Sequence, residues 1–262
     1  MSGVLDQHLG AAMAPARPQG AALPLSVLVL GAAGSLGSAL LERLLAQDSQ
    51  GQVFVATRNV LNVGIRGLHE VRVDASGPLP IVRADCAVLV YDRPRFSNGR
   101  DDAFWSPQPQ DLVPVARWLR SCGVGMLAVV MPHAPSTLPE ALKLGLANLD
   151  EEAVAMLDFE RLLFVRSAQR PGDARVGSQL QRLAWWMLSQ LHLMVPQREQ
   201  PVRPAKVAEF VCEALRNLSR ARAGTWVARP ELVWEASQTV DVDQLVLRWL
   251  ELAPVEEQPA ST

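Results

Sequence analysis

One stretch constrains the fold more than any other: VLVLGAAGSLGSALLERLL, residues 27–45. It begins as an apolar strand, passes through small residues and continues with leucines spaced to line one face of a helix. Between strand and helix stand Gly31, Gly34 and Gly37 in a GxxGxxG pattern. In this context the glycines permit a sharp turn, backbone approach to a pyrophosphate and close helix–strand packing. Amides at the helix N-terminus then bind the anion, so the stretch predicts a dinucleotide site, with a plain tight turn as the alternative.

Strand-like and helical patterns alternate along the rest of the chain. We expect strands at 25–30, 52–57, 69–74, 86–91, 126–131, 162–167 and 224–229. We expect helices over 35–46, 110–122, 138–157, 178–195, 203–218 and 242–252. Most strands are continuous apolar runs, which indicates that both faces of the sheet are covered. The pattern predicts an α/β Rossmann fold: a doubly wound, mostly parallel sheet of about six to seven strands, with a small C-terminal helical cap.

Length and composition favour a single domain over 25–252, with its cap starting at about 170 and flexible tails at 1–24 and 253–262. With its glycine motif, we expect this domain to bind NAD(P). The net charge of −2 gives no field that would gather nucleic acid, and no apolar window is long enough to cross a bilayer. We therefore expect neither a nucleic-acid nor a membrane partner. The three cysteines are scattered, which favours a cytoplasmic location, and the four histidines lie too far apart for us to expect a metal site.

The ends of the second and third strands bear on the choice of cofactor. NAD-selective Rossmann proteins place an acid after the second strand, but here Thr57 and Arg58 stand in that position. An arginine can pair with a 2′-phosphate, so the sequence favours NADP over NAD, unless Arg58 is only a solvated surface residue. After the third strand, Asp74 is placed either to meet the adenine edge or only to cap the strand.

These motifs resemble those of one known family. GAAGSLG, the TR after the second strand, VDAS after the third and FERLLFVRSAQRPG near residue 165 look like atypical short-chain dehydrogenases/reductases, and most like the NmrA-like and TIP30-like NADP-binding proteins. The resemblance covers roughly residues 25–215. It implies a Rossmann sheet with the substrate lying over the carboxyl ends of its strands.

The resemblance also implies a catalytic pair that this chain lacks. Reductases of the family use Tyr-x-x-x-Lys on the helix after the fifth strand, but Tyr91 is the chain's one tyrosine and follows the fourth strand. On that helix the pair would become Pro139 with Lys143 or Lys143 with Ala147. The remaining candidates for proton transfer are His133, Lys143 and Tyr91, each of which also has a plain structural explanation.

A long loop follows the fourth strand and carries Phe104 and Trp105, which we expect to be exposed. With Trp185 and Trp186 they could line an apolar pocket over the nicotinamide, or simply join the cap to the core. Two functions stay open: an NADP(H)-dependent oxidoreductase with an atypical site, or a non-catalytic NADP(H)-responsive regulator. Besides the cofactor, we expect the partner to be a small apolar substrate or a protein. We expect the chain to be a monomer or a homodimer. The cofactor-binding residues we expect are Gly31, Gly34, Ser35, Leu36, Gly37, Thr57, Arg58, Asp74, Ala75, Tyr91 and Met131.

Overall fold

The structure is a computed structural model, and it describes residues 25–47, 51–61, 64–74, 79–92, 101–131, 150–166 and 202–253. Within these residues, seven strands form one sheet in the order β3-β2-β1-β4-β5-β6-β7. Every neighbouring pair is parallel. The strands are β1 Val27–Leu30, β2 Val53–Thr57, β3 Leu68–Arg72, β4 Cys86–Val90, β5 Met126–Met131, β6 Arg161–Arg166 and β7 Gly224–Ala228. This strand order is that of a doubly wound Rossmann fold, which confirms the predicted class.

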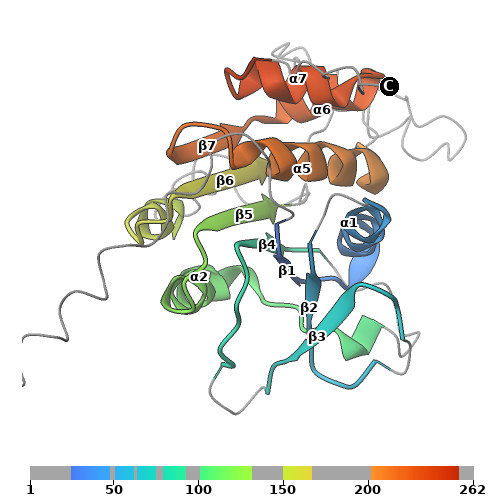
Figure 1. The fold of residues 1–262 in the computed structure, drawn as a ribbon, viewed down its shortest axis with the longest axis vertical. Coiled ribbons are helices and arrows are strands. Elements are labelled where there is room, and N and C mark those ends of the chain that lie inside the picture. Colours follow the sequence, from blue (N-terminus) through green and yellow to red (C-terminus); the bar gives the residue numbers. More distant parts are fainter. Residues whose placement is uncertain are drawn as a thin grey trace, which may run out of the picture.

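Two apolar clusters cover the two faces of the sheet because alternate residues of each strand point to opposite sides. On one face, Val29, Val55 and Val88 pack with leucines of α1 (Gly34–Ala46) and with α5 (Pro204–Leu218). On the other face, the alternate strand residues pack against α2 (Leu112–Ser121). Figure 1 shows α1 and α2 on opposite sides of the strands. The continuous apolar runs of the sequence follow from this two-sided burial.

Two C-terminal helices lie outside α5, and one of them was not predicted from the sequence. The start of the predicted cap, at about 170, lies outside the described residues. Helices α6 (Pro230–Gln238) and α7 (Val242–Trp249) both pack on α5 and lie at the top of Figure 1. Trp249 joins the layers, with its ring 5.8 Å from Phe210 of α5 and 5.7 Å from Trp226 of β7. Pro230 in the first turn of α6 and Glu231 beside it are the usual signals of a helix start.

Strand bounds agree with the predicted ones to within two residues, whereas the helix predictions are only partly tested. The last helix ends at Trp249 instead of 252. Of the helix expected over 138–157, residues 150–155 are helical and 138–149 lie outside the described residues. The helix expected over 178–195 also lies outside them. Among the described helices, we find none with the length and hydrophobicity needed to span a bilayer.

Candidate functional site

The predicted site residues follow neighbouring strands of the sheet and so meet at its carboxyl edge. Asp74 follows β3, Arg58 follows β2, Gly31 follows β1 and Tyr91 follows β4, while Met131 is the last residue of β5. The order of strands in the sheet reverses between β1 and β4, and ligands of open α/β sheets bind at such a switch point. Ala75, His133 and Lys143 lie outside the described residues.

The glycine turn has the backbone that the sequence predicts. Gly31 has a φ of +82° and Gly34 a φ of +87°, a region that residues with a Cβ rarely adopt. A Cβ on Gly31 would lie 2.0 Å from the carbonyl oxygen of Val90, and one on Gly37 would lie 2.2 Å from the carbonyl oxygen of Gly31. The turn is therefore packed against β4 on one side and against the first turn of α1 on the other.

A carboxylate already lies on the N-terminus of α1. The N-cap residue is Ala33, whose side chain cannot accept a hydrogen bond. Instead, the backbone amide of Leu36 donates to Asp92 Oδ2 at 2.6 Å, and the hydroxyl of Ser35 donates to the same oxygen at 3.4 Å. Asp92 comes from the residues that follow β4, across the switch point. The N-terminus of α1 therefore donates to a carboxyl group of the chain itself, as the positive end of the helix dipole favours.

Part of the loop after β4 crosses the ends of β1 and β2. We call residues 101–105 the crossing segment. The amide of Gly31 donates to the carbonyl of Trp105 at 3.1 Å, and the amide of Trp105 donates to the carbonyl of Ala56 at 3.0 Å. The amide of Arg58 donates to the carbonyl of Ala103 at 2.7 Å. The crossing segment thus runs antiparallel to the end of β2 and is hydrogen-bonded to the glycine turn as well.

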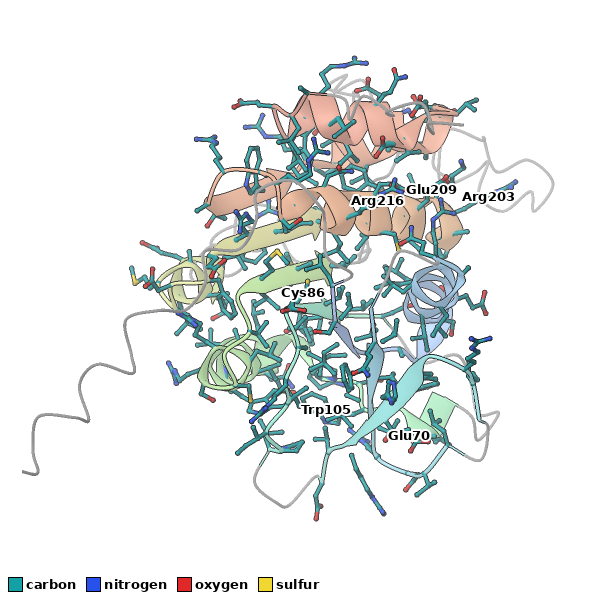
Figure 2. The ribbon with its side chains drawn as sticks, in the orientation of Figure 1. Glu70, Cys86, Trp105, Arg203, Glu209 and Arg216 are labelled. Atoms are coloured by element: carbon teal, nitrogen blue, oxygen red, sulfur yellow. The ribbon has the colours of Figure 1, made fainter. Side chains whose placement is uncertain are left out.

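The aromatic residues of the crossing segment are less exposed than the sequence predicts. Phe104 is buried in the apolar cluster on the α1 face. Trp105 is half-buried between α2 and the end of β2 (Figure 2), and its ring meets that of Trp118 edge-on at 6.2 Å. The expectation of two exposed aromatics was wrong because each packs against a helix on one face of the sheet. Trp185 and Trp186 lie outside the described residues.

The two polar side chains at the ends of β2 and β4 are partly sequestered. Thr57 is fully buried, and within the described residues its hydroxyl has no hydrogen-bond partner. The same is true of the buried hydroxyl of Tyr91. Burial raises the pKa of the Tyr91 phenol well above its ordinary value, and the nearby carboxylates of Asp111 and Asp150 raise it further. The phenol is therefore neutral at physiological pH.

Two features of this edge were missing from the predicted site residues. The first is Asp92, which was not among the predicted site residues, although an acid shortly after the strand that neighbours β1 was a usable signal. The second feature is Arg166 at the end of β6, which is paired with Met131 across β5 and β6. Its guanidinium donates to both carboxylate oxygens of Glu151, at 3.0 and 2.8 Å.

Comparison with known proteins yields similarities of fold only. No protein-family model matches the chain, and no curated protein matches it in sequence. A nucleoside-diphosphate-sugar epimerase from Staphylococcus aureus has a TM-score of 0.48 at 12% identity, over 86% of this chain and 88% of that one. A short chain dehydrogenase family protein from Francisella tularensis has a TM-score of 0.42 at 14% identity, over 78% of this chain and 96% of that one. The Bordetella bronchiseptica enzyme WbmG, solved in complex with NAD, has a TM-score of 0.35 at 15% identity, over 90% of this chain and 96% of that one.

Proposed function

We propose that the protein binds NADP(H) at the carboxyl edge of the sheet and is an oxidoreductase of the short-chain dehydrogenase type that lacks the Tyr-x-x-x-Lys pair. The observation that carries the proposal is the 2.6 Å contact between the Leu36 amide and the carboxylate of Asp92. It supports an anion site at the start of α1, next to the switch point where Rossmann proteins hold a pyrophosphate. The fold and the glycine turn fit a dinucleotide in the same way.

Each part of the cofactor has candidate partners in this arrangement. The pyrophosphate would bind at the start of α1, to Gly31, Gly34, Ser35, Leu36 and Gly37. The 2′-phosphate and its ribose would bind at the end of β2, to Thr57 and Arg58, and the adenine would bind after β3, to Asp74 and Ala75. The nicotinamide would lie at the ends of β4 and β5, next to Tyr91 and Met131.

The proposed preference for NADP over NAD rests on Arg58. Its side chain is exposed, directly beyond the last residue of β2. Loss of one charge-assisted contact costs about 1.5–3 kcal/mol, so Arg58→Ala should remove roughly ten- to a hundredfold of the preference for NADPH. Calorimetric titration with NADPH and NADH measures this, with Arg117→Ala, an exposed arginine of α2, as the matched control. Equal affinities of the wild-type protein for the two cofactors would contradict the assignment.

A bound nicotinamide supplies or accepts the hydride, so this chain must supply or accept the proton. In the family's reductases a lysine lowers the pKa of the catalytic tyrosine, whereas here burial and two carboxylates raise the pKa of Tyr91. This environment suits a neutral hydrogen-bond donor better than a group that exchanges protons near neutral pH. Among the proposed catalytic residues, His133 and Lys143 stay predictions from the sequence.

The environment of Tyr91 also favours a second candidate function, a non-catalytic protein that responds to NADP(H). Oxidation of NADPH against ketones, aldehydes and quinones distinguishes the two functions, with wild type, His133→Ala and Tyr91→Phe compared. A positioned acid contributes about 10²–10⁴ in rate, so we expect slow turnover, which His133→Ala lowers by at least about tenfold. Fast wild-type turnover that neither substitution changes would refute this assignment of the site. Tight NADPH binding without turnover on any substrate would favour the second function.

A further inference from the structure

The atoms that a dinucleotide would need at this edge are engaged by the chain itself. Leu36 is the third residue of α1, and its amide points to the place where the helix would receive a phosphate. Asp92 holds that amide at 2.6 Å. A carboxylate and a pyrophosphate cannot share one donor at close range, because their negative charges repel each other.

The crossing segment occupies the neighbouring place. In Rossmann proteins the adenosine ribose lies between the first turn after β1 and the end of β2. Here the main chain of Ala103 and Trp105 is hydrogen-bonded to both elements: to Gly31 on one side and to Ala56 and Arg58 on the other. The side chain of Phe104 is 8% exposed and belongs to the same apolar cluster as Leu36. The crossing segment is therefore anchored in the core and not laid loosely over the edge.

We propose that the protein closes its own dinucleotide site, with Asp92 in the place of the pyrophosphate and the crossing segment in the place of the adenosine ribose. This inference rests on the proposed function and adds its regulation. The cofactor can bind only when both contacts are released, so its apparent affinity is the intrinsic affinity reduced by the fraction of open molecules. Any change that weakens the closed state should therefore strengthen cofactor binding.

The first test removes the carboxylate with Asp92→Ala. We expect NADPH to bind at least about tenfold more tightly, because the competing anion is gone. The same substitution removes a helix cap, so the melting temperature of the protein without cofactor should fall by about 2–4 °C. A purely structural role would lower the melting temperature without tightening binding.

Asp241→Ala is the matched control for this test. Asp241 accepts a hydrogen bond from the amide of Gln244, the third residue of α7, at 3.0 Å, as Asp92 does from the third residue of α1. We expect a similar loss of melting temperature and an unchanged affinity for NADPH. Unchanged or weaker NADPH binding by Asp92→Ala would overturn the self-closure. No NADPH binding by folded wild type and by folded Asp92→Ala would instead refute the proposed function, and the inference with it.

The second test locks the crossing segment in place. Thr57 and Phe104 face each other in an antiparallel bridge. The hydrogen bonds from Trp105 to Ala56 and from Arg58 to Ala103 flank this pair, so it is of the non-hydrogen-bonded type, with Cα atoms about 4.5 Å apart. That separation lies within the range that a disulfide spans. The double variant Thr57→Cys/Phe104→Cys can therefore join the crossing segment to β2.

The locked and unlocked states are compared in the same double variant, which separates the effect of the lock from that of the substitutions. We expect the oxidised form to bind NADPH at least about tenfold more weakly than the reduced form, with reduction restoring the affinity. Wild type carried through the same oxidation controls for its own three cysteines. Equal NADPH binding by the oxidised and reduced forms would show that the crossing segment need not move, and would overturn this part of the proposal.

Discussion

At the scale of single residues, two glycines of the GxxGxxG motif are needed for the close packing of the chain itself, independently of any ligand. The added Cβ atoms at Gly31 and Gly37 would meet backbone atoms of Val90, Gly31 and Ala32. Both glycines are therefore required whether or not a cofactor binds. The motif predicted the turn correctly, because the turn is a local property. It could not show which anion the turn holds, because the group now in contact with it, Asp92, is distant in sequence.

The close packing of Gly37 gives a stability prediction. In Gly37→Ala the new Cβ would lie 2.2 Å from one backbone oxygen and 2.8 Å from the Cα of Ala32, so α1 must shift. We expect a loss of about 1–3 kcal/mol in the free energy of unfolding, which urea denaturation measures. Gly64→Ala is the control, since no atom lies within 4 Å of its Cβ position, and it should change the stability little. Equal stability of the two variants would show that the α1 junction tolerates the extra atom.

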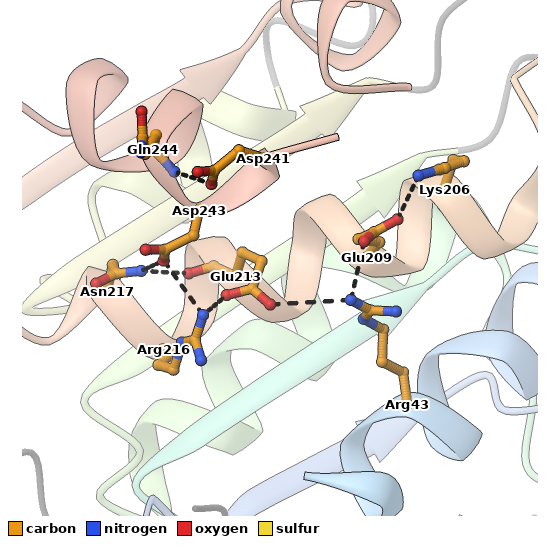
Figure 3. A network of polar contacts seen from close by, with 9 residues as sticks. All are labelled: Arg43, Lys206, Glu209, Glu213, Arg216, Asn217, Asp241, Asp243 and Gln244. Atoms are coloured by element: carbon orange, nitrogen blue, oxygen red, sulfur yellow. Dashed lines mark hydrogen bonds and ion pairs between the residues drawn. The ribbon is translucent and has the colours of Figure 1, made fainter. Parts of the chain in front are cut away.

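At the scale of elements, a chain of ion pairs joins α1 to α5 and α5 to α7 (Figure 3). Arg43 of α1 lies 3.0 Å from Glu209 and 3.9 Å from Glu213, both on α5. Glu213, whose side chain is 10% exposed, also pairs with Arg216, which in turn reaches Asp243 of α7 at 3.2 Å. The sequence predicted these three helices but not their pairing, because Arg43 and Glu213 lie far apart along the chain.

Arg43 links α1 to α5 in this network, so its loss should weaken the contact between the two helices. Arg43→Met keeps the aliphatic stem but removes the positive charge that lies beside the little-exposed carboxylate of Glu213. We therefore expect a loss of about 1 kcal/mol in the free energy of unfolding. The figure is modest because Arg43 is 38% exposed and Glu213 keeps Arg216. Lys206→Met, whose ion pair with Glu209 lies along one helix, should cost only a few tenths. Chemical denaturation compares them, and a smaller loss for Arg43→Met than for Lys206→Met would contradict the interpretation.

At the scale of the whole molecule, the sequence predicted what local pattern determines and missed what distant contacts determine. Most strands carry their own apolar run, and all seven were placed from local pattern. Their parallel arrangement brings the described site residues to one edge. The crossing segment was expected to be an unpaired loop because its partners lie in β1 and β2, many residues away. Asp92 was assigned no contact for the same reason. The described residues of the candidate site thus lie along one edge of the sheet, while the contacts that Asp92 and the crossing segment make there were not foreseen.

The buried thiols make the stability of the whole molecule sensitive to alkali. Burial raises the pKa of Cys86 and of Cys212 from 9.0 to about 12, and the pKa of Tyr91 is raised as well. Above pH 9 the unfolded chain therefore loses protons that the folded protein keeps, so the free energy of unfolding should fall as the pH rises. Each thiol contributes up to about 1.4 kcal/mol per pH unit between pH 9 and 12. Urea denaturation at pH 8, 9 and 10 measures the slope, which should be shallower in Cys86→Ala than in wild type and in the partly exposed control Cys122→Ala. The same slope in all three proteins would mean that the Cys86 thiol does not titrate differently in the folded and unfolded states.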